Sequence, residues 1–311
     1  MEMNKENEQE NLENILISLG KSISRWTDNE ERVETSIPGL SLFRRKQPTG
    51  PMGGMYEPSI CIIVQGAKRV LLGDDTYVYD ANHYLVTAVH LPTIAEVITA
   101  SETKPYLGLR LKFDLHQIAQ LMADSKLPPP RAQQSPRGMA TGKVTLPLLS
   151  CFQRLLDLLE EDEDIPILAP GTIREITYRL LIGDQGERLR QIASVFSQGH
   201  QIARIIDWLK DNYTASLRIE DLAKQVSMSA SSFHHHFKSL TAMTPLQFQK
   251  MLRLNEARRI MLTEPADAST VAFHVGYESV SQFNREYRRL FGAPPVRDIK
   301  KLREIPVEGR A

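Results

Sequence analysis

The sequence contains few cysteines and no long apolar run. Cys61 and Cys151 are its only cysteines among 311 residues, and they lack the spacing of a metal site. Two thiols in a chain of this length are typical of a reducing compartment. No apolar stretch approaches the ~18 residues of a membrane span, and the acidic start MEMNKENEQE is unlike a secretory signal. We therefore expect a cytoplasmic protein without a membrane partner.

Common enzyme motifs are also missing. The chain has no G-x-S-x-G, no H-E-x-x-H and no glycine-rich phosphate loop. These absences disfavour the hydrolase, zinc-peptidase and nucleotide-binding classes. We expect no catalytic residue and no cofactor.

The chain has no net charge, but its charge is unevenly distributed. From residue 200 to the end it has 17 Lys and Arg against 12 Asp and Glu, whereas residues 1–199 have 21 and 26. A basic C-terminal part beside an acidic N-terminal part favours DNA binding by one domain only. A length of 311 residues accommodates two domains, each with its own core.

One supersecondary pattern occurs twice in the C-terminal part. Residues 219–245 read IEDLAKQVSMSASSFHHHFKSLTAMTP, and residues 268–295 read ASTVAFHVGYESVSQFNREYRRLFGAPP. Each copy has a short apolar helix, a tight polar turn and a longer helix with an aromatic pair. The pairs are Phe233/Phe237 and Phe283/Tyr287, so the second copy lies 50 residues after the first. Before the turn the two copies are offset by 49 residues, because the second turn is one residue longer. Helix, turn, helix is the arrangement that places a second helix in the major groove of DNA.

Hydrogen-bonding residues cover the predicted outer faces of the two second helices. Ser229 and Ser279 occupy expected N-cap positions. Arg285 suits a bidentate contact to guanine, and Gln282 a contact to adenine. The predicted base contacts are Ser231, His234, His235, Ser281, Gln282 and Arg285, and the predicted phosphate contacts are Ser229, Lys238, Lys250, Ser279, Arg288 and Arg289.

A continuous helix is predicted between the two copies, over residues 246–262. Seventeen residues at ~1.5 Å each give a rod of about 25 Å. Such a rod can hold two reading helices near successive major-groove faces, which lie ~34 Å apart on one side of DNA.

At these residues the chain resembles the AraC/XylS family of bacterial transcription regulators. The resemblance covers residues 200–303 and includes LAKQVSMSASSFHHHFK, TPLQFQKMLRLNEARRIML and VAFHVGYESVSQFNREYRRLFGAPP. Ser227 and Ala242 stand where the family often has Gly, and Asp298 where a Tyr is common. The resemblance implies an all-α domain at 200–303 with two helix-turn-helix motifs joined by a long helix, followed by a tail at 304–311.

Short β-rich runs separated by turn residues occupy residues 37–113. Gly73-Asp74-Asp75 predicts a hairpin turn. This part resembles the cupin-like β-barrel of one AraC branch, in PSICIIVQGAKRV, YDANHYLVTAV and PYLGLRLKFD. The resemblance implies an effector-binding and dimerisation domain at 31–185, then a linker at 186–199. The expected fold class is α+β, an N-terminal cupin-like β-barrel with flanking helices before the all-α domain.

Helices are predicted on both sides of the barrel sequence. Residues 1–30 form a tail and helix: 1–10 are expected to be disordered, and the apolar face from residue 12 to 26 packs on its own domain or on a partner subunit. Pro128-Pro129-Pro130 begins an irregular loop that runs to residue 142. Helices at 146–160 and 173–181 follow. They look like the family's dimerisation element, or they merely cover the barrel.

Cys61, His83 and His90 are candidates for effector sensing. Cys61 is either a buried inert thiol or a thiolate that reacts with an electrophile, and the resemblance points to an aldehyde because some regulators of this branch respond to aldehydes. His83 and His90 are seven residues apart and lack the H-x-H pair of metal-binding cupins, so we expect no metal. The run His234-His235-His236 cannot converge on one ion, because successive helical residues point about 100° apart.

The sequence favours a sequence-specific transcription regulator, an activator whose barrel binds a small effector. The expected partners are double-stranded promoter DNA, RNA polymerase and a second copy in a homodimer. Two other classes remain open. One is a cupin-type metalloenzyme whose tail localises it on DNA, and metal analysis would identify it. The other is a non-specific architectural DNA binder, which competition with random DNA would reveal.

Overall fold

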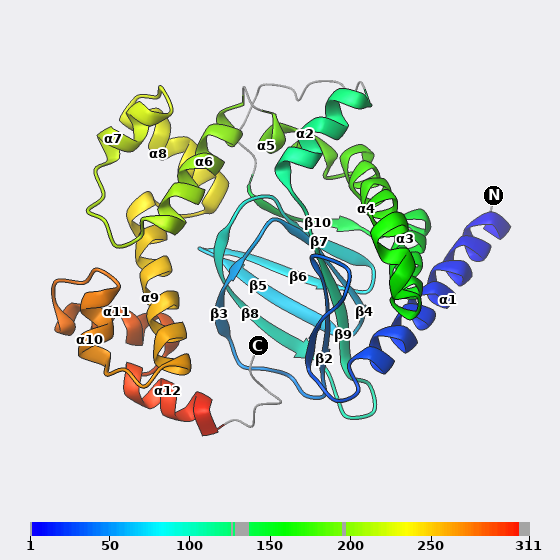
Figure 1. The fold of residues 1–311 in the computed structure, drawn as a ribbon, viewed down its shortest axis with the longest axis horizontal. Coiled ribbons are helices and arrows are strands. Elements are labelled where there is room, and N and C mark those ends of the chain that lie inside the picture. The colour runs from blue at the N-terminus through cyan, green and yellow to red at the C-terminus, as the bar shows by residue number, and fades with distance from the viewer. Residues whose placement is uncertain (1, 126, 128–136, 195–196, 305–311) are drawn as a thin grey trace.

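A computed structural model describes residues 2–125, 127, 137–194 and 197–304. Figure 1 shows a β-domain with helices along one side, and a group of helices from the C-terminal part of the chain along the other. The expected α+β architecture is confirmed. Among the described helices, none combines the length and the apolar character that a membrane span needs.

Two antiparallel sheets form the N-terminal β-domain. Strands β4 and β5 follow the predicted β-rich runs, and the β5–β6 hairpin turns at Gly73-Asp74 as expected. The six-stranded sheet has the order β1 (Arg32–Glu34), β2 (Leu40–Arg45), β9 (Tyr106–Lys112), β4 (Ser59–Gln65), β7 (His83–Thr87) and β10 (Met139–Lys143). The four-stranded sheet has the order β3 (Met52–Tyr56), β8 (Leu91–Thr99), β5 (Ala67–Leu72) and β6 (Asp75–Asp80).

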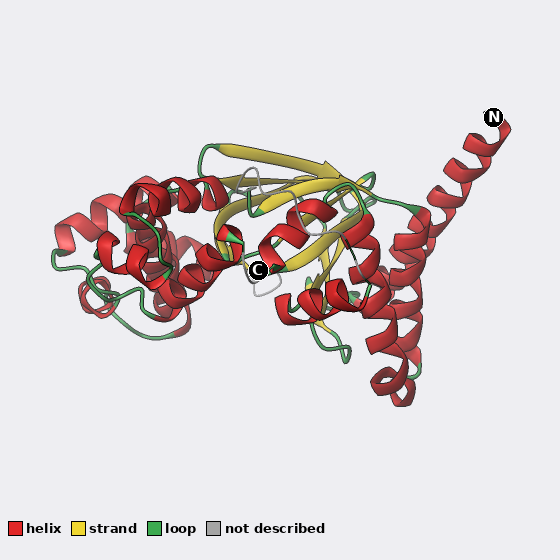
Figure 2. Ribbon diagram, turned by 90° about the horizontal axis from the view of Figure 1, so that it is seen from above, coloured by secondary structure: helices red, strands yellow, loops and turns green. Residues whose placement is uncertain are grey.

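Helix α1 (Glu2–Trp26) packs on its own domain. Leu19 and Ile23 are fully buried, and the helix contacts β4, β9 and α3 (Leu146–Asp157). The expectation that residues 1–10 are disordered is wrong from residue 2 onward. Glu, Lys and Gln are abundant there and favour helix, so α1 begins at Glu2, and Figure 2 shows this end projecting from the body.

Three other segments of this domain differ from the prediction. Strand β10 lies within the stretch expected to be irregular up to residue 142, and it pairs with β7; residues 128–136 of that stretch lie outside the described part. Helix α4 (Ile165–Ile182) starts earlier than expected, with Pro166 in its first turn, where the missing N–H has no cost. The expected linker contains helix α5 (Gly186–Ala193).

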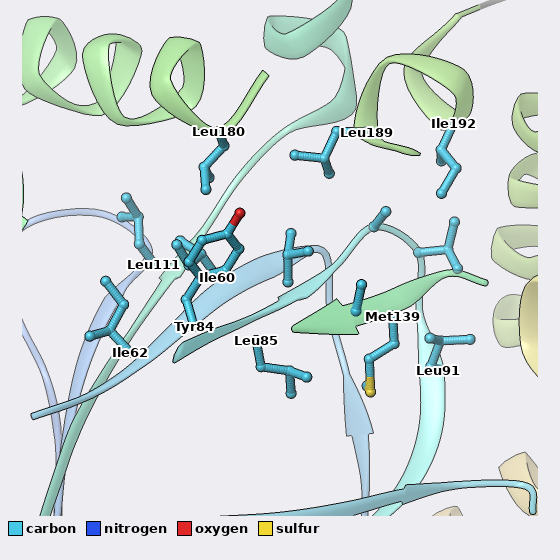
Figure 3. Packing of buried hydrophobic residues seen from close by; sticks show 14 of the residues in the cluster. Ile60, Ile62, Tyr84, Leu85, Leu91, Leu111, Met139, Leu180, Leu189 and Ile192 are labelled. Carbon is cyan, nitrogen blue, oxygen red and sulfur yellow. The ribbon is translucent and has the colours of Figure 1, made fainter. Parts of the chain in front are cut away.

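Helices α4 and α5 cover the outer face of the six-stranded sheet. Figure 3 shows Leu180 of α4 and Leu189 and Ile192 of α5 on the side of the sheet to which the Tyr84 ring points, whereas the Met139 side chain points to the other side. All five side chains are almost fully buried. The segment predicted as a linker is therefore part of the core, because its apolar residues lie on one face of a helix. Helix α2 (Leu115–Asp124) follows β9 and packs against α4 and α5.

The C-terminal part is all-α, as expected, and contains both helix-turn-helix motifs. The first consists of α7 (Ile219–Gln225) and α8 (Ala230–Thr241), the second of α10 (Ala268–His274) and α11 (Val280–Phe291). Helix α6 (Gln198–Asp211) precedes them, α9 (Pro245–Thr263) joins them, and α12 (Pro295–Glu304) follows.

Candidate nucleic-acid interface and effector cavity

Helix α8 presents the polar face that the sequence predicts. The Ser229 hydroxyl caps its start by accepting the backbone N–H of Ser232 at 3.1 Å. Phe233 and Phe237 are fully buried. The opposite face therefore points outward, and Ser231, His234, His235 and Lys238 are all exposed.

Helix α11 repeats this design. The Ser279 hydroxyl accepts the backbone N–H of Gln282 at 3.3 Å, and Phe283 and Tyr287 are fully buried. Gln282 is only half-exposed, and its amide donates to Glu286 at 3.2 Å. The other predicted contacts of this helix, Ser281, Arg285, Arg288 and Arg289, are exposed.

Helix α9 is the predicted connector between the two motifs. It has 19 residues, and at ~1.5 Å per residue it is about 28 Å long. Thr244 and Gln247 form a reciprocal capping box at its start, which the sequence reading missed although T-x-x-Q fits the pattern.

Lys250 occupies a different environment from the one expected of a phosphate contact. Its Nζ donates to Oε1 of Glu286 at 2.7 Å and so joins α9 to α11. The Tyr277 hydroxyl donates to the other carboxylate oxygen at 2.8 Å. Burial opposes ionisation of Glu286, but hydrogen bonds from Lys250, Tyr277 and Gln282 bring its pKa below the usual value. In this structure Lys250 therefore stabilises the second motif.

A second buried charge cluster fixes the end of α11 against α12. The Arg258 guanidinium donates to both oxygens of Asp298, at 2.8 and 3.0 Å, and lies 4.3 Å from the ring centroid of Phe291. The Tyr287 hydroxyl donates to the same carboxylate at 2.8 Å. Asp298, where the family commonly has Tyr, is therefore a fully paired acid in the C-terminal packing.

The two other departures from the family pattern lie at left-handed backbone positions. Ser227 has φ 53° and Ala242 has φ 61°, and these are the positive-φ residues other than glycine in the described chain. Gly276 and Gly292 occupy the matching positions of the second motif, with φ 87° and 79°. A side chain at positive φ costs ~1–2 kcal/mol, so the first motif contains strain that the second avoids.

The β-domain encloses a cavity of about 290 Å³ between its sheets. The hydroxyls of Tyr56 and Thr93 and Nε of Arg110 are buried at this cavity and have no hydrogen-bond partner among the described residues. Lys68 lies 5.4 Å from the centroid of the Tyr56 ring. Such groups require a polar partner, because unpaired buried donors and acceptors are costly. The cavity is therefore suited to a small molecule that carries oxygen atoms.

Of the three candidate sensing residues, only Cys61 lines this cavity. Burial raises the pKa of its thiol, which disfavours the reactive thiolate. His83 lies at the start of β7 beside Asp80, with Nδ1 3.3 Å from the carboxylate. His90 contacts Asp207 of α6 at 2.9 Å, so it lies between the two halves of the chain. The structure thus separates these three residues.

The comparisons with protein families agree with this arrangement. Residues 36–188 match the family described as the N-terminus of AraC-type transcriptional regulators, and residues 222–300 match a helix-turn-helix domain family. The chain belongs to the AraC/XylS family. Its β-domain is the N-terminal part of an AraC-type regulator, and its C-terminal part is a helix-turn-helix domain.

Curated relatives of this AraC-family chain include the HTH-type transcriptional activator RhaS. RhaS from Escherichia coli O157:H7 is 26% identical over 163 residues, which are 52% of this chain and 58% of RhaS. RhaS from Escherichia coli O1:K1 is 28% identical over 147 residues, 47% of this chain and 50% of that protein. The chain thus spans about half the length of the curated relatives it matches.

The fold of this AraC-family chain is similar to that of ToxT from Vibrio cholerae. A ToxT structure with a bound unsaturated fatty acid has a TM-score of 0.54 and 10% identity, covering 84% of this chain and 94% of ToxT. An apo structure of a singly substituted ToxT has a TM-score of 0.52 and 10% identity, covering 86% and 99%. At this identity the likeness concerns the fold alone.

Contacts between the two halves of this AraC-family chain were not predicted from the sequence. Arg137 bonds to the last turn of α8, and Asp207 of α6 bonds to His90. Neither contact has a local sequence pattern, because each joins residues more than 100 positions apart. Within the described residues, no group of three or more His, Cys, Asp or Glu side chains is placed to hold a metal ion.

Proposed function

We propose that this chain is a sequence-specific transcription activator in which a small effector in the β-domain controls how two reading helices meet DNA. One observation carries the proposal. Two serine-capped helices, α8 and α11, expose hydrogen-bonding side chains while their aromatic residues are buried. Helix α8 packs against the rod α9, and the ion pair of Lys250 with Glu286 joins α11 to the same rod. A varied polar face on a rigid helix is what reading of base edges in the major groove requires.

The exposed side chains of the two helices divide into two roles. Ser231, His234, His235, Ser281, Gln282 and Arg285 are the proposed base contacts. Gln282 must exchange its bond to Glu286 for one to a base. The proposed phosphate contacts are Ser229, Lys238, Ser279, Arg288 and Arg289. Lys250 is omitted from the proposal because its charge is already paired with Glu286.

The proposed effector is a small oxygen-bearing molecule that binds non-covalently in the cavity of the β-domain. The unpaired polar groups of Tyr56, Thr93 and Arg110 supply donors and an acceptor, and Lys68 adds a cation. The raised pKa of the Cys61 thiol argues against covalent capture of an aldehyde. Mass spectrometry after exposure to an aldehyde tests this point, because a modified Cys61 would favour the covalent mode.

The proposed partners follow from the reading of DNA and from the surface of α4. An activator at a promoter acts in the cytoplasm on RNA polymerase. Helix α4 exposes Ile167, Leu168, Tyr178 and Ile182 on its outer side. We propose this face as the homodimer contact, because exposed apolar side chains on one helix are typical of association surfaces.

Selection of double-stranded DNA from a random pool by the full chain tests the function. We expect one recurring site, and Arg285→Ala to weaken binding to it by ~1–3 kcal/mol with loss of preference at one base position. Arg25→Ala is the matched control, because it removes an exposed arginine from α1, away from both reading helices and from the proposed dimer face of α4. No enriched sequence would refute specific reading and favour an architectural DNA binder. An equal loss on all sequences would make Arg285 a phosphate contact.

A further inference from the structure

A short segment of the β-domain holds the C-terminal end of helix α8. The Arg137 guanidinium donates to the backbone carbonyls of Lys238 at 2.8 Å and Ser239 at 2.6 Å. The backbone N–H of Gly138 donates to the carbonyl of Leu240 at 2.7 Å. The last carbonyls of a helix lack partners within the helix and favour a cation nearby. The β-domain thus supplies the cap of the first reading helix.

The turn of the β5–β6 hairpin lies against the same end of α8. Asp75 pairs with Nε of Arg137 at 2.6 Å. Gly73 lies so close to Ala242 that a Cβ atom there would be 2.8 Å from the Ala242 carbonyl oxygen. Gly73 also has φ +59°, so its lack of a side chain serves both the turn and the close approach. Charge pairing and packing together keep the turn at α8.

The acidic turn consequently faces the residues of α8 that we assign to DNA. Asp74, Asp75 and Arg137 share one open hollow of about 550 Å³ with Ser231, His234, His235 and Lys238. DNA phosphates bound at Lys238 would approach both carboxylates, and like charges at close range repel. Helix α11 differs, because within the described residues no hydrogen bond or ion pair joins its exposed face to the β-domain.

We propose that the Asp74-Asp75 turn, fastened by Arg137, is an autoinhibitory latch on the first reading helix. The latch rests on the proposed DNA-binding function and assigns its regulation. With the latch closed, α11 is free to read DNA, whereas α8 is obstructed by two carboxylates. Binding of DNA through both helices then requires the turn to leave the end of α8.

The same hairpin connects the latch to the proposed effector cavity. Lys68 of β5 and Tyr79 of β6 line the cavity, and the turn between these strands carries Asp74 and Asp75. On the other side of the latch, Met139 follows Gly138 directly and is fully buried where β10 pairs with β7. A molecule that shifts β5 and β6 therefore moves the latch, because both strands are continuous with its turn.

Neutralising the latch tests the proposal. We compare the double variant Asp74→Asn/Asp75→Asn with wild type on the DNA site selected by the full chain. The control is Glu102→Gln/Glu163→Gln, which makes the same change in net charge at exposed positions in other parts of the β-domain. We expect the latch variant to bind about fivefold more tightly or better, and the control to change binding less than about twofold. Equal effects of the two variants would overturn the latch.

Hydrogen exchange supplies a measurement that needs no variant. The Gly138 amide is bonded to Leu240, so we expect slow exchange in the free full chain and faster exchange when the selected DNA is added. A Gly138 amide that stays protected on DNA would show that the latch remains closed and would refute the proposal. A wrong proposed function would give a different result from a wrong latch, because the wild-type chain would then enrich no DNA sequence from the random pool.

Discussion

The two motifs and the helices that flank them are offset by 50 residues. The positions of Trp208, Phe237 and Phe248 around the first motif correspond to those of Arg258, Tyr287 and Asp298 around the second. The Phe237 and Phe248 rings meet edge to face with centroids 5.5 Å apart. Their counterparts form the buried ion pair and hydrogen bond described above. Two copies of one backbone plan are thus stabilised by different forces. A single substitution destabilises a buried ion pair more than an aromatic contact, because loss of one charged residue leaves the other buried and unpaired.

The motifs also differ in backbone strain and in their contacts with the β-domain. The first places Ser227 and Ala242 at left-handed positions where the second has glycine, and only the first is capped by the β-domain. The second motif supplies its own polar cluster around Glu286. The comparison shows that the β-domain caps the reading helix of the first motif through hydrogen bonds. The second motif meets the β-domain through the close approach of Gly53 in β3 to Phe291 at the end of α11.

The largest expected effect concerns the buried ion pair. Arg258→Met leaves Asp298 buried without its cation, and we expect the free energy of unfolding to fall by ~3–5 kcal/mol. Urea denaturation of the full chain measures this loss. The triple variant Arg258→Met/Asp298→Leu/Tyr287→Phe converts the site to the apolar type of the first motif without leaving the Tyr287 hydroxyl unpaired, and it should recover most of the loss. A triple variant no more stable than the single one would show that charge pairing is not what distinguishes the motifs.

The next effect is on DNA affinity and compares the two reading faces. Arg285→Ala should cost ~1–3 kcal/mol of binding free energy at the selected site, because its helix is unobstructed. His235→Ala should cost less in wild type than in the Asp74→Asn/Asp75→Asn background. Fluorescence anisotropy with labelled DNA measures both. Equal costs of His235→Ala in the two backgrounds would mean that α8 is already fully engaged.

A smaller effect concerns the left-handed positions. Gly292 has open space around it, so Gly292→Ala should destabilise through the backbone alone, by about 1 kcal/mol. Ser227→Gly makes the reverse change at an exposed position and should stabilise the first motif by ~0.5–1 kcal/mol. Thermal unfolding of both variants checks the opposite signs. Destabilisation by Ser227→Gly would show that its side chain compensates for the strain.

The smallest effects are in pH dependence. Burial and the neighbouring His235 lower the pKa of His236, and the contacts of Glu286, its counterpart, lower the pKa of that carboxyl. Each lowered pKa contributes to the stability of the fold, and this contribution is complete above the pKa of the unfolded chain. It is lost as pH falls below that value, which is about 6.5 for histidine and about 4.3 for glutamate. The stability difference between wild type and His236→Gln should shrink between pH 7 and pH 5, and that for Glu286→Gln only below about pH 4.5. Coincident windows would contradict the assignment.

The sequence predicted the elements that depend on local pattern. The caps at Ser229 and Ser279 and the aromatic pairs follow from spacing within one helix, so both motifs could be predicted. Strand β10 could not, because its MATGK sequence lacks apolar alternation and it is positioned by pairing with β7.

The environment of charged residues was the hardest part of the site to predict. From the sequence alone, Lys250 is expected to be a free surface cation. In the structure α11 lies against α9 and places Glu286 beside it. The latch is likewise set by tertiary contacts, since Arg137 and Lys238 are 101 residues apart. The acid at position 298 was the one indication in the sequence that the second motif has an ionic core.

The capped rod α9 joins the two motifs, because it follows α8 and precedes α10. Each residue added to it would turn the second reader by about 100° and advance it by ~1.5 Å. Point substitutions on α8 and α11 can therefore retune which bases are preferred, one position at a time. The distance between α8 and α11 changes only by insertion or deletion in α9, which rotates α11 at the same time, so we expect the spacing of the two DNA segments to change less readily than the bases preferred within each.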